Sequence, residues 1–259
     1  MMKMNHFYLI GIQYLGYRYH GWAIQPEVNT VQRMVERTLK FVLSGAKFKV
    51  LITGRTDAMV SANQSYFELF LDEAIVPDEF LMRFNENLPS DIRALSITPV
   101  DKDFNIINDP KSKEYLYFFS YGEKNHPFAA PYICALSGQL DIGMMQQGAK
   151  LLEGMHDFVN FAYKPKADTI TRRTIDLAEI VINDVMTASF FPKTSYVFRV
   201  WGKGFMRHQV RMMMGCLITL GRGEITLTHM QALLEAREVA PLTYIAPATG
   251  LMLNEVIFR

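Results

Sequence analysis

The sequence predicts an α+β protein made of two ferredoxin-like (βαββαβ) halves. Their sheets are expected to lie side by side as a central mixed, mainly antiparallel sheet with a cleft. Between residues 7 and 100, strand-like and helix-like segments follow one another in the order βαββαβ. A polar stretch around Asn108-Asp109-Pro110 interrupts this series, and residues 114 to 258 then repeat the order approximately, with insertions. This order is that of the split βαβ unit, whereas the side-by-side sheets are an inference about packing.

The first half begins with a strand over residues 7–14, where apolar and aromatic side chains alternate as on a half-buried strand. Asn29 is then expected to cap a helix, with Gln32 at the reciprocal capping position. Strands are predicted over 48–53, 66–71 and 92–100. Asp78 is expected to cap a short helix between the last two.

The second half is expected to start with a strand over 114–121. Helices are predicted over 142–152, 206–220 and about 228–236, and strands over 175–182, 196–201 and 251–258. Because Asn-Asp-Pro favours a turn, the domain boundary is placed near it. We expect residues 1–103 to form an N-terminal α/β domain and residues 104–259 a C-terminal α/β domain.

Bulk composition favours an intracellular globular protein. The chain has 259 residues, of which 49% are hydrophobic and 20% charged, with a formal net charge of +1. The apolar run 212–220 is too short to span a bilayer, and the N-terminus lacks the pattern of a signal peptide. Cys134 and Cys216 stand far apart without ligand spacing. These features predict a cytoplasmic protein without a membrane partner, and a near-neutral chain permits a nucleic-acid partner only if its cations cluster.

The string Gly54-Arg55-Thr56-Asp57-Ala58 lies in a loop between two predicted strands. Loops held by rigid strands often carry catalytic groups. The neighbouring Arg55 would keep Asp57 ionised, which makes the carboxylate a candidate nucleophile or general base. An ordinary turn with a surface ion pair explains the same residues, so the string alone leaves both interpretations open.

Two further residues are candidates in the second half. Tyr115 begins a predicted strand, either as a core residue or as a platform on which a base stacks. Arg211 lies where the helix following Phe205 becomes apolar all round. A buried arginine needs an anion, which a phosphate or Asp57 would supply; a solvated first helical turn is the alternative. There is no P-loop, no GxSxG elbow and no GxGxxG turn.

Taken together, the ordered motifs resemble those of the tRNA pseudouridine synthase A family over nearly the whole chain. The motifs are Gly21-Trp22 with Gln25, Asn29-Thr30-Val31-Gln32, Gly54-Arg55-Thr56-Asp57-Ala58, Asn87-Leu88-Pro89, Asp103-Phe104, Tyr115 with Tyr117, Gly154-x-His156-Asp157-Phe158-x-x-Phe161, Arg173-Thr174, residues 205–215, and Gly250-Leu251. Each motif is weak by itself, and their joint order and spacing are specific.

The resemblance implies an enzyme that isomerises uridine to pseudouridine in tRNA, in the anticodon stem-loop around positions 38 to 40. It implies no metal, no organic cofactor and a homodimer. Asp57 matches the catalytic aspartate, Tyr115 the tyrosine that packs on the target base, and Arg211 the arginine that pairs with the aspartate. Arg55 matches an arginine that helps to displace the target nucleotide, which must leave its stack to be reached.

The sequence departs from the family pattern around this core. Met59 and Ser61 stand where the family has glycine and histidine, and Ile24 and Ile107 stand where it has arginine. Losing the glycine removes backbone freedom beside the aspartate, and each lost arginine should weaken RNA binding and its salt dependence. Two alternatives follow: a non-catalytic RNA-binding protein on the same scaffold, or a pseudouridine synthase with a different RNA target.

Overall fold

The computed structural model describes residues 4–236 and 242–258. Residues 1–3, which the sequence predicts to lead directly into the first strand, lie outside this description. The chain forms two compact units, Met1–Lys111 with Leu253–Arg259, and Ser112–Met252. The final strand therefore returns most of its length to the first unit.

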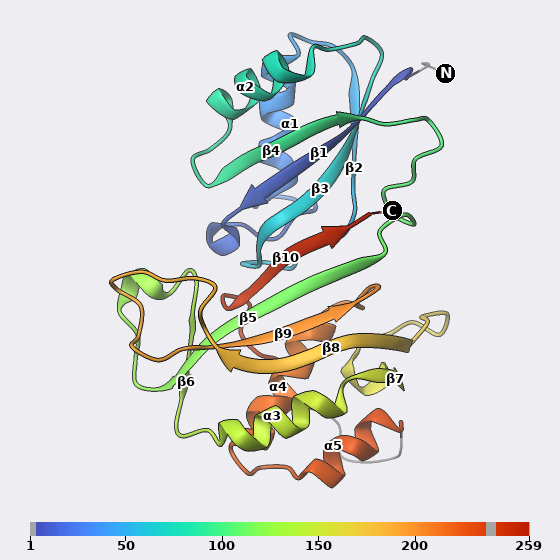
Figure 1. Ribbon diagram of the computed structural model, residues 1–259. Helices are drawn as coiled ribbons and strands as arrows, with labels where there is room; N and C mark the ends of the chain where they lie inside the picture. The colour runs from blue at the N-terminus through green and yellow to red at the C-terminus, as the bar shows by residue number, and fades with distance from the viewer. Residues whose placement is uncertain (1–3, 237–241, 259) are drawn as a thin grey trace. The chain divides into compact units, whose positions relative to one another are not determined.

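The first unit contains an antiparallel sheet in which β1 lies between β3 and β4, with β2 pairing with β3 (Figure 1). The strands are β1 His6–Tyr14, β2 Phe48–Ile52, β3 Ser61–Leu71 and β4 Ile92–Pro99. Ile10 is opposite Phe67 on one side and Ile97 on the other. Strand β10 Leu251–Ile257 borders β3, and Asn63 donates a hydrogen bond from Nδ2 to Asn254 Oδ1 at 3.1 Å.

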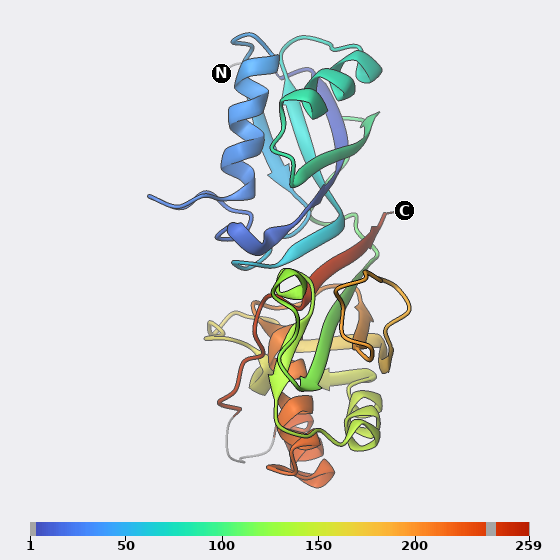
Figure 2. The same cartoon turned by 90° about the vertical axis from the view of Figure 1, so that its left-hand side faces the viewer.

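Two helices complete this unit. Figure 2 shows α1 (Val31–Val42), in blue, running along one side of the strands. Its apolar stripe is buried, and Thr30 accepts a hydrogen bond from Arg33 N as the N-cap. Helix α2 (Pro77–Asn87) packs against α1 and β4, and buries Phe80 and Phe84. The unit's element order β1-α1-β2-β3-α2-β4 is the predicted βαββαβ.

The second unit has an antiparallel sheet in the order β5-β9-β8-β7, with the short β6 parallel to β5. The strands are β5 Ser112–Gly122, β6 Cys134–Ser137, β7 Gly154–Asp157, β8 Arg172–Ile182 and β9 Tyr196–Gly202. The helices are α3 Ile142–Leu151, α4 Gln209–Gly221 and α5 Leu227–Leu234. Short 3₁₀ turns are η1 Gly16–Arg18, η2 Pro127–Ala129 and η3 Phe158–Phe161.

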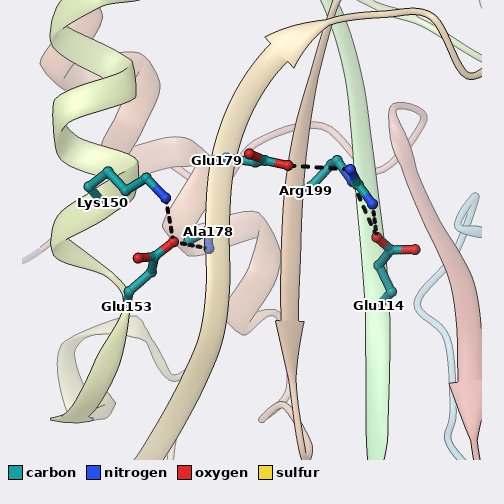
Figure 3. Close-up of polar contacts among 6 residues, drawn as sticks. All are labelled: Glu114, Lys150, Glu153, Ala178, Glu179 and Arg199. Atoms are coloured by element: carbon teal, nitrogen blue, oxygen red, sulfur yellow. Dashed lines mark hydrogen bonds and ion pairs between the residues drawn. The ribbon is translucent and has the colours of Figure 1, made fainter.

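Ion pairs between charged side chains link the neighbouring strands β5, β9 and β8 of the second unit (Figure 3). Arg199 on β9 pairs with Glu114 on β5 at 2.8 Å and with Glu179 on β8 at 3.3 Å. Glu114 is almost fully buried, so its charge is compensated by a hydrogen-bonded guanidinium, as a buried carboxylate requires. Nearby, Glu153 accepts a hydrogen bond from Ala178 N and pairs with Lys150.

Three predicted helix starts are wrong. Thr30 rather than Asn29 caps α1. Both residue types can accept a capping hydrogen bond, but it is the Thr30 hydroxyl that accepts the bond from Arg33 N. Helix α2 begins at Pro77, so Asp78 lies inside its first turn. Helix α4 begins at Gln209 rather than at residue 206, because His208 has a φ of 59°, which is left-handed and cannot continue a helix.

The α+β class and the mainly antiparallel pairing, with β5–β6 as a parallel pair, are confirmed. The chain order β5-α3-β8-β9-α4-β10 gives the second βαββαβ series, to which β6, β7 and α5 are additions. Across residues 4–236 and 242–258, no helix combines the length and apolar character needed to cross a membrane.

Candidate active site

Asp57 lies in the loop that joins β2 to β3. Thr53 N donates to Tyr66 O at 3.2 Å at the start of this loop, and Val60 N donates to Asp57 O at 3.2 Å at its end. Thr56 is buried, Asp57 is half-buried and Arg55 is exposed. The loop therefore presents the aspartate at the protein surface with its backbone fixed on both sides.

The loop after β1 holds the Asp57 loop from a second direction. Trp22 N donates to Thr56 O at 3.3 Å, and Met59 N donates to Tyr19 O at 2.9 Å. The hydroxyls of Tyr14 and Thr56 are 2.8 Å apart and share a hydrogen bond. These contacts are made by the residues on both sides of Asp57. Nothing local in the sequence indicates that Tyr14 and Tyr19 support this loop.

A charged group anchors that supporting loop. Arg18 and the hydroxyl of Tyr19 both donate to the carboxylate of Asp91, the latter at 2.8 Å. Partial burial alone would raise the pKa of Asp91, but the hydrogen bonds from Arg18 and Tyr19 leave it below its ordinary value. Burial raises the pKa of Tyr19 to about 12, so its hydroxyl remains a donor at neutral pH. In the sequence, this anchor consists of two adjacent residues, Arg18 and Tyr19, and of Asp91, which lies 72 residues beyond Tyr19.

Met59 has a φ of 67°. Left-handed backbone is uncommon for residues other than glycine, asparagine and aspartate. The family pattern has glycine at this position. The structure gives the physical reason, because the turn after Asp57 requires the conformation that glycine adopts without cost.

A cavity of about 330 Å³ opens beside the same loop. It is lined by Trp22, Gln32, Val50, Leu51, Ile52, Thr53, Gly54, Arg55 and Ile107. The two isoleucines that replace family arginines are exposed: Ile24 by 47% and Ile107 by 63%. The surface around the loop is therefore more apolar than the family pattern predicts.

In the second unit, Tyr115 lies on β5 opposite Val200 and is half-buried. Its ring meets that of Phe205 edge to face, with the centroids 5.2 Å apart and the planes at 83°. Such an arrangement fixes the ring plane while leaving part of the ring exposed. Tyr115 is thus neither a fully buried core residue nor a mobile surface side chain.

Arg211 lies in the first turn of α4 and is half-buried. Its Nε donates to Ala246 O at 2.8 Å, while Ala246 N donates to Arg211 O at 3.1 Å. The buried Tyr117 donates from its hydroxyl to Pro247 O at 2.8 Å. The segment through Ala246 and Pro247 therefore holds the guanidinium in a set direction, a role that sequence analysis did not assign to it.

The structure thus places Asp57 and Arg55 in the first unit and Tyr115 and Arg211 in the second. The joint action of the four residues stays a prediction. Within residues 4–236 and 242–258, no three histidine, cysteine, aspartate or glutamate side chains gather as ligands of a metal ion.

Comparison with known proteins identifies the family. A family model described as tRNA pseudouridine synthase matches residues 149–259. A protein named tRNA pseudouridine synthase A from Exiguobacterium sibiricum is 34% identical over 250 residues, which cover 95% of this chain and 94% of that protein. Proteins of the same name from Shouchella clausii and Mycoplasmoides gallisepticum are each 30% identical. The matches cover 95% and 100% of this chain, and 90% and 94% of the respective relatives. The chain belongs to the tRNA pseudouridine synthase A family.

Proposed function

We propose that this protein isomerises uridine to pseudouridine in tRNA, in the anticodon stem-loop around positions 38 to 40. The observation that carries the proposal is the match to relatives named tRNA pseudouridine synthase A along almost the entire length of both chains. The tRNA is the substrate, and the reaction takes place in the cytoplasm.

Asp57 carries the chemistry in this proposal. The N1–C1′ glycosidic bond breaks, the uracil turns, and C5 bonds to C1′; C5 loses a proton and N1 gains one, so the reaction is an isomerisation. The carboxylate of Asp57 either adds to the sugar or removes a proton from it, and both routes need it ionised and close to C1′. Its half-buried loop, fixed by Trp22 and Tyr19, supports this role.

The other site residues act on the same uridine. Tyr115 packs on the flipped uracil, which its fixed ring plane supports. Arg211 orients the aspartate, and the bond from its Nε to Ala246 O, which fixes the guanidinium, supports this role. Arg55 is exposed and enters the RNA to displace the target nucleotide. Residues 1–103 supply the aspartate loop, residues 104–259 supply Tyr115 and Arg211, and two copies of the chain work as a homodimer.

A second candidate function is isomerisation in another RNA. The exposed Ile24 and Ile107 favour it, because both replace arginines that would contact phosphates. Each lost contact weakens RNA binding regardless of sequence, so a different RNA would have to supply other contacts.

Mapping pseudouridine across total RNA, in cells with and without the gene, tests these proposals. The proposed function predicts the loss of pseudouridine at positions 38 to 40 of tRNAs and its return with the wild-type gene, but not with Asp57→Ala. Loss at other RNA positions would support the second candidate. An unchanged map would contradict both and would favour an RNA-binding protein without catalysis.

A further inference from the structure

We propose that Tyr163, Lys164 and Arg207 form a binding site for the phosphodiester backbone of the substrate RNA. The proposal rests on the proposed function in taking RNA as the ligand. It assigns a contact to residues of the second unit that the catalytic account does not use.

The three residues come from two separate segments. Tyr163 follows η3 on the connection from β7 to β8, and Arg207 precedes α4. Tyr163 N donates to Arg207 O at 3.3 Å, which joins the segments through the backbone. The Arg207 guanidinium lies 5.3 Å from the centre of the Tyr163 ring, and Lys164 Nζ lies 5.4 Å from it. Two exposed cations thus lie against one half-buried ring.

The charge around this ring is strongly one-sided. Residues 163–173 and 203–208 contain six lysines and arginines but one acidic residue, Asp168, although the whole chain has a formal net charge of only +1. The six are Lys164, Lys166, Arg172, Arg173, Lys203 and Arg207. Asp157 is opposite Arg172 in the sheet, but its Oδ1 accepts a hydrogen bond from Val159 N at 3.1 Å. The two segments therefore carry a formal net charge of +5, six cations less one carboxylate, and such an excess favours a polyanion as ligand.

Among the described residues, neither Lys164 nor Arg207 forms an ion pair with a carboxylate. Cation–π contacts hold the two groups in place, but they do not neutralise either positive charge. A phosphate oxyanion would supply the compensating negative charge, and the planar guanidinium matches phosphate geometry. The chemistry of the cluster therefore fits a phosphodiester better than an apolar or cationic partner.

The position of the cluster suits the substrate of this enzyme. Arg207 follows Phe205 by two residues, and the Phe205 ring packs against Tyr115. A phosphate bound at Tyr163 would therefore lie on a segment directly connected to the residue proposed to pack on the target base. The site would hold the backbone near the flipped nucleotide without taking part in bond making.

The test measures RNA binding without turnover. In an Asp57→Ala background, the affinity for an unmodified tRNA transcript is measured at several salt concentrations for the starting protein and for Lys164→Gln with Arg207→Gln. We expect weaker binding and a salt slope shallower by about 1.4 to 1.8, since each lost phosphate contact contributes about 0.7 to 0.9. The matched control is Lys124→Gln with Lys193→Gln, which removes two exposed lysines of the same unit outside the cluster and should leave the slope unchanged.

The role of the ring is tested separately. Tyr163→Leu should reproduce part of the decrease in the salt dependence of RNA binding. Tyr163→Phe, which keeps the ring, should bind RNA like the starting protein. Thermal unfolding of each variant checks that the fold is retained. With Asp57 intact, the Gln pair should raise KM for tRNA and leave kcat unchanged, because the site positions RNA and does not touch the reacting atoms.

Two results would overturn the inference: a slope equal to that of the Lys124 and Lys193 control, or equal binding by Tyr163→Leu and Tyr163→Phe. This test distinguishes failure of the phosphate site from failure of the proposed function. If the wild-type protein forms no pseudouridine but the Gln pair lowers the slope, the enzyme proposal fails and the phosphate site stands. If the wild-type protein is active and the slope is unchanged, the phosphate site alone fails.

Discussion

Gly21 lies directly against the backbone carbonyl of Thr56. A Cβ at Gly21 would be 2.5 Å from Thr56 O and 3.0 Å from the carbonyl carbon of Asp57, and Gly21 has a φ of +82°. Both the close approach and the left-handed backbone require glycine. The loop after β1 therefore sets the position of the Asp57 backbone, although 35 or more residues separate the two in sequence.

We predict that Gly21→Ala lowers kcat by about 10- to 100-fold, because a shift of the order of an ångström at a reacting group has effects of this size. Gly45→Ala is the matched control, since Gly45 also has a positive φ, +92°, but a Cβ there meets nothing within 4 Å. It should cost about 1 kcal/mol of stability through backbone strain and leave kcat unchanged. Equal kcat values for the two variants would show that the contact does not position Asp57.

Replacing Met59 tests the strain beside the aspartate. Met59→Gly should raise the free energy of unfolding by about 0.5 to 1 kcal/mol, because relief of left-handed strain exceeds the extra entropy of glycine in the unfolded chain. Met59→Ala keeps a Cβ at the φ of 67° and should bring no such gain. Urea denaturation measures both, and a destabilised Met59→Gly protein would contradict the interpretation.

Glu68 makes stability depend on pH. Its side chain is buried on β3, and burial raises its pKa to about 6, with Asp109 also raising it and Lys49 lowering it. At Glu68 the folded state therefore binds a proton more tightly than the unfolded state does. The resulting contribution to the free energy of unfolding is present at low pH and is lost as the pH rises through about 6.

Glu68→Gln should therefore be more stable than wild type by about 1 to 2 kcal/mol at pH 7.5, and the difference should disappear near pH 4. The glutamine oxygen can still accept the hydrogen bond from Ile106 N. Glu86→Gln, at an exposed position on α2, is the control and should show no such pH dependence. A Glu68→Gln protein less stable than wild type at pH 7.5 would contradict this account.

Arg211→Lys keeps the positive charge but cannot reproduce both the bond from Nε to Ala246 O and a second directed bond. We expect it to lower kcat by about 100-fold, in the range of lost electrostatic stabilisation, with little change in thermal stability. Tyr117→Phe removes the hydroxyl bond to Pro247 in the same segment. It should instead cost about 1 to 2 kcal/mol of stability and affect kcat less, and the opposite order of effects would assign Arg211 a structural role.

The long elements were predictable because their side-chain periods are local. Strand β1 alternates and α1 has an apolar stripe, so both appear in the sequence. Strands β6 and β7 have four residues each, too few to show a period. The start of α4 could not be predicted, because nothing local indicates that His208 adopts a left-handed backbone.

In the candidate site, too, the sequence predicted the residues that lie in local motifs and not those that depend on tertiary contacts. Asp57, Tyr115 and Arg211 are candidates because they lie in short motifs whose order resembles a family, and their roles stay predictions. Their supports were not found, because they depend on contacts between distant segments. The approach of Gly21 to Thr56, the anchor of Tyr19 on Asp91, and the Ala246 carbonyl on Arg211 exist only once the chain has folded.

The central claim is tested most directly with purified protein and a tRNA transcript whose uridines carry tritium at C5. Pseudouridine formation releases that hydrogen, because C5 forms the new bond to C1′. We predict tritium release by the wild-type protein that matches the pseudouridine formed. Release should fall to background with Asp57→Asn, which keeps the side-chain shape and removes the charge. Equal release by wild type and Asp57→Asn, or none by wild type under conditions where the tRNA is bound, would contradict the account.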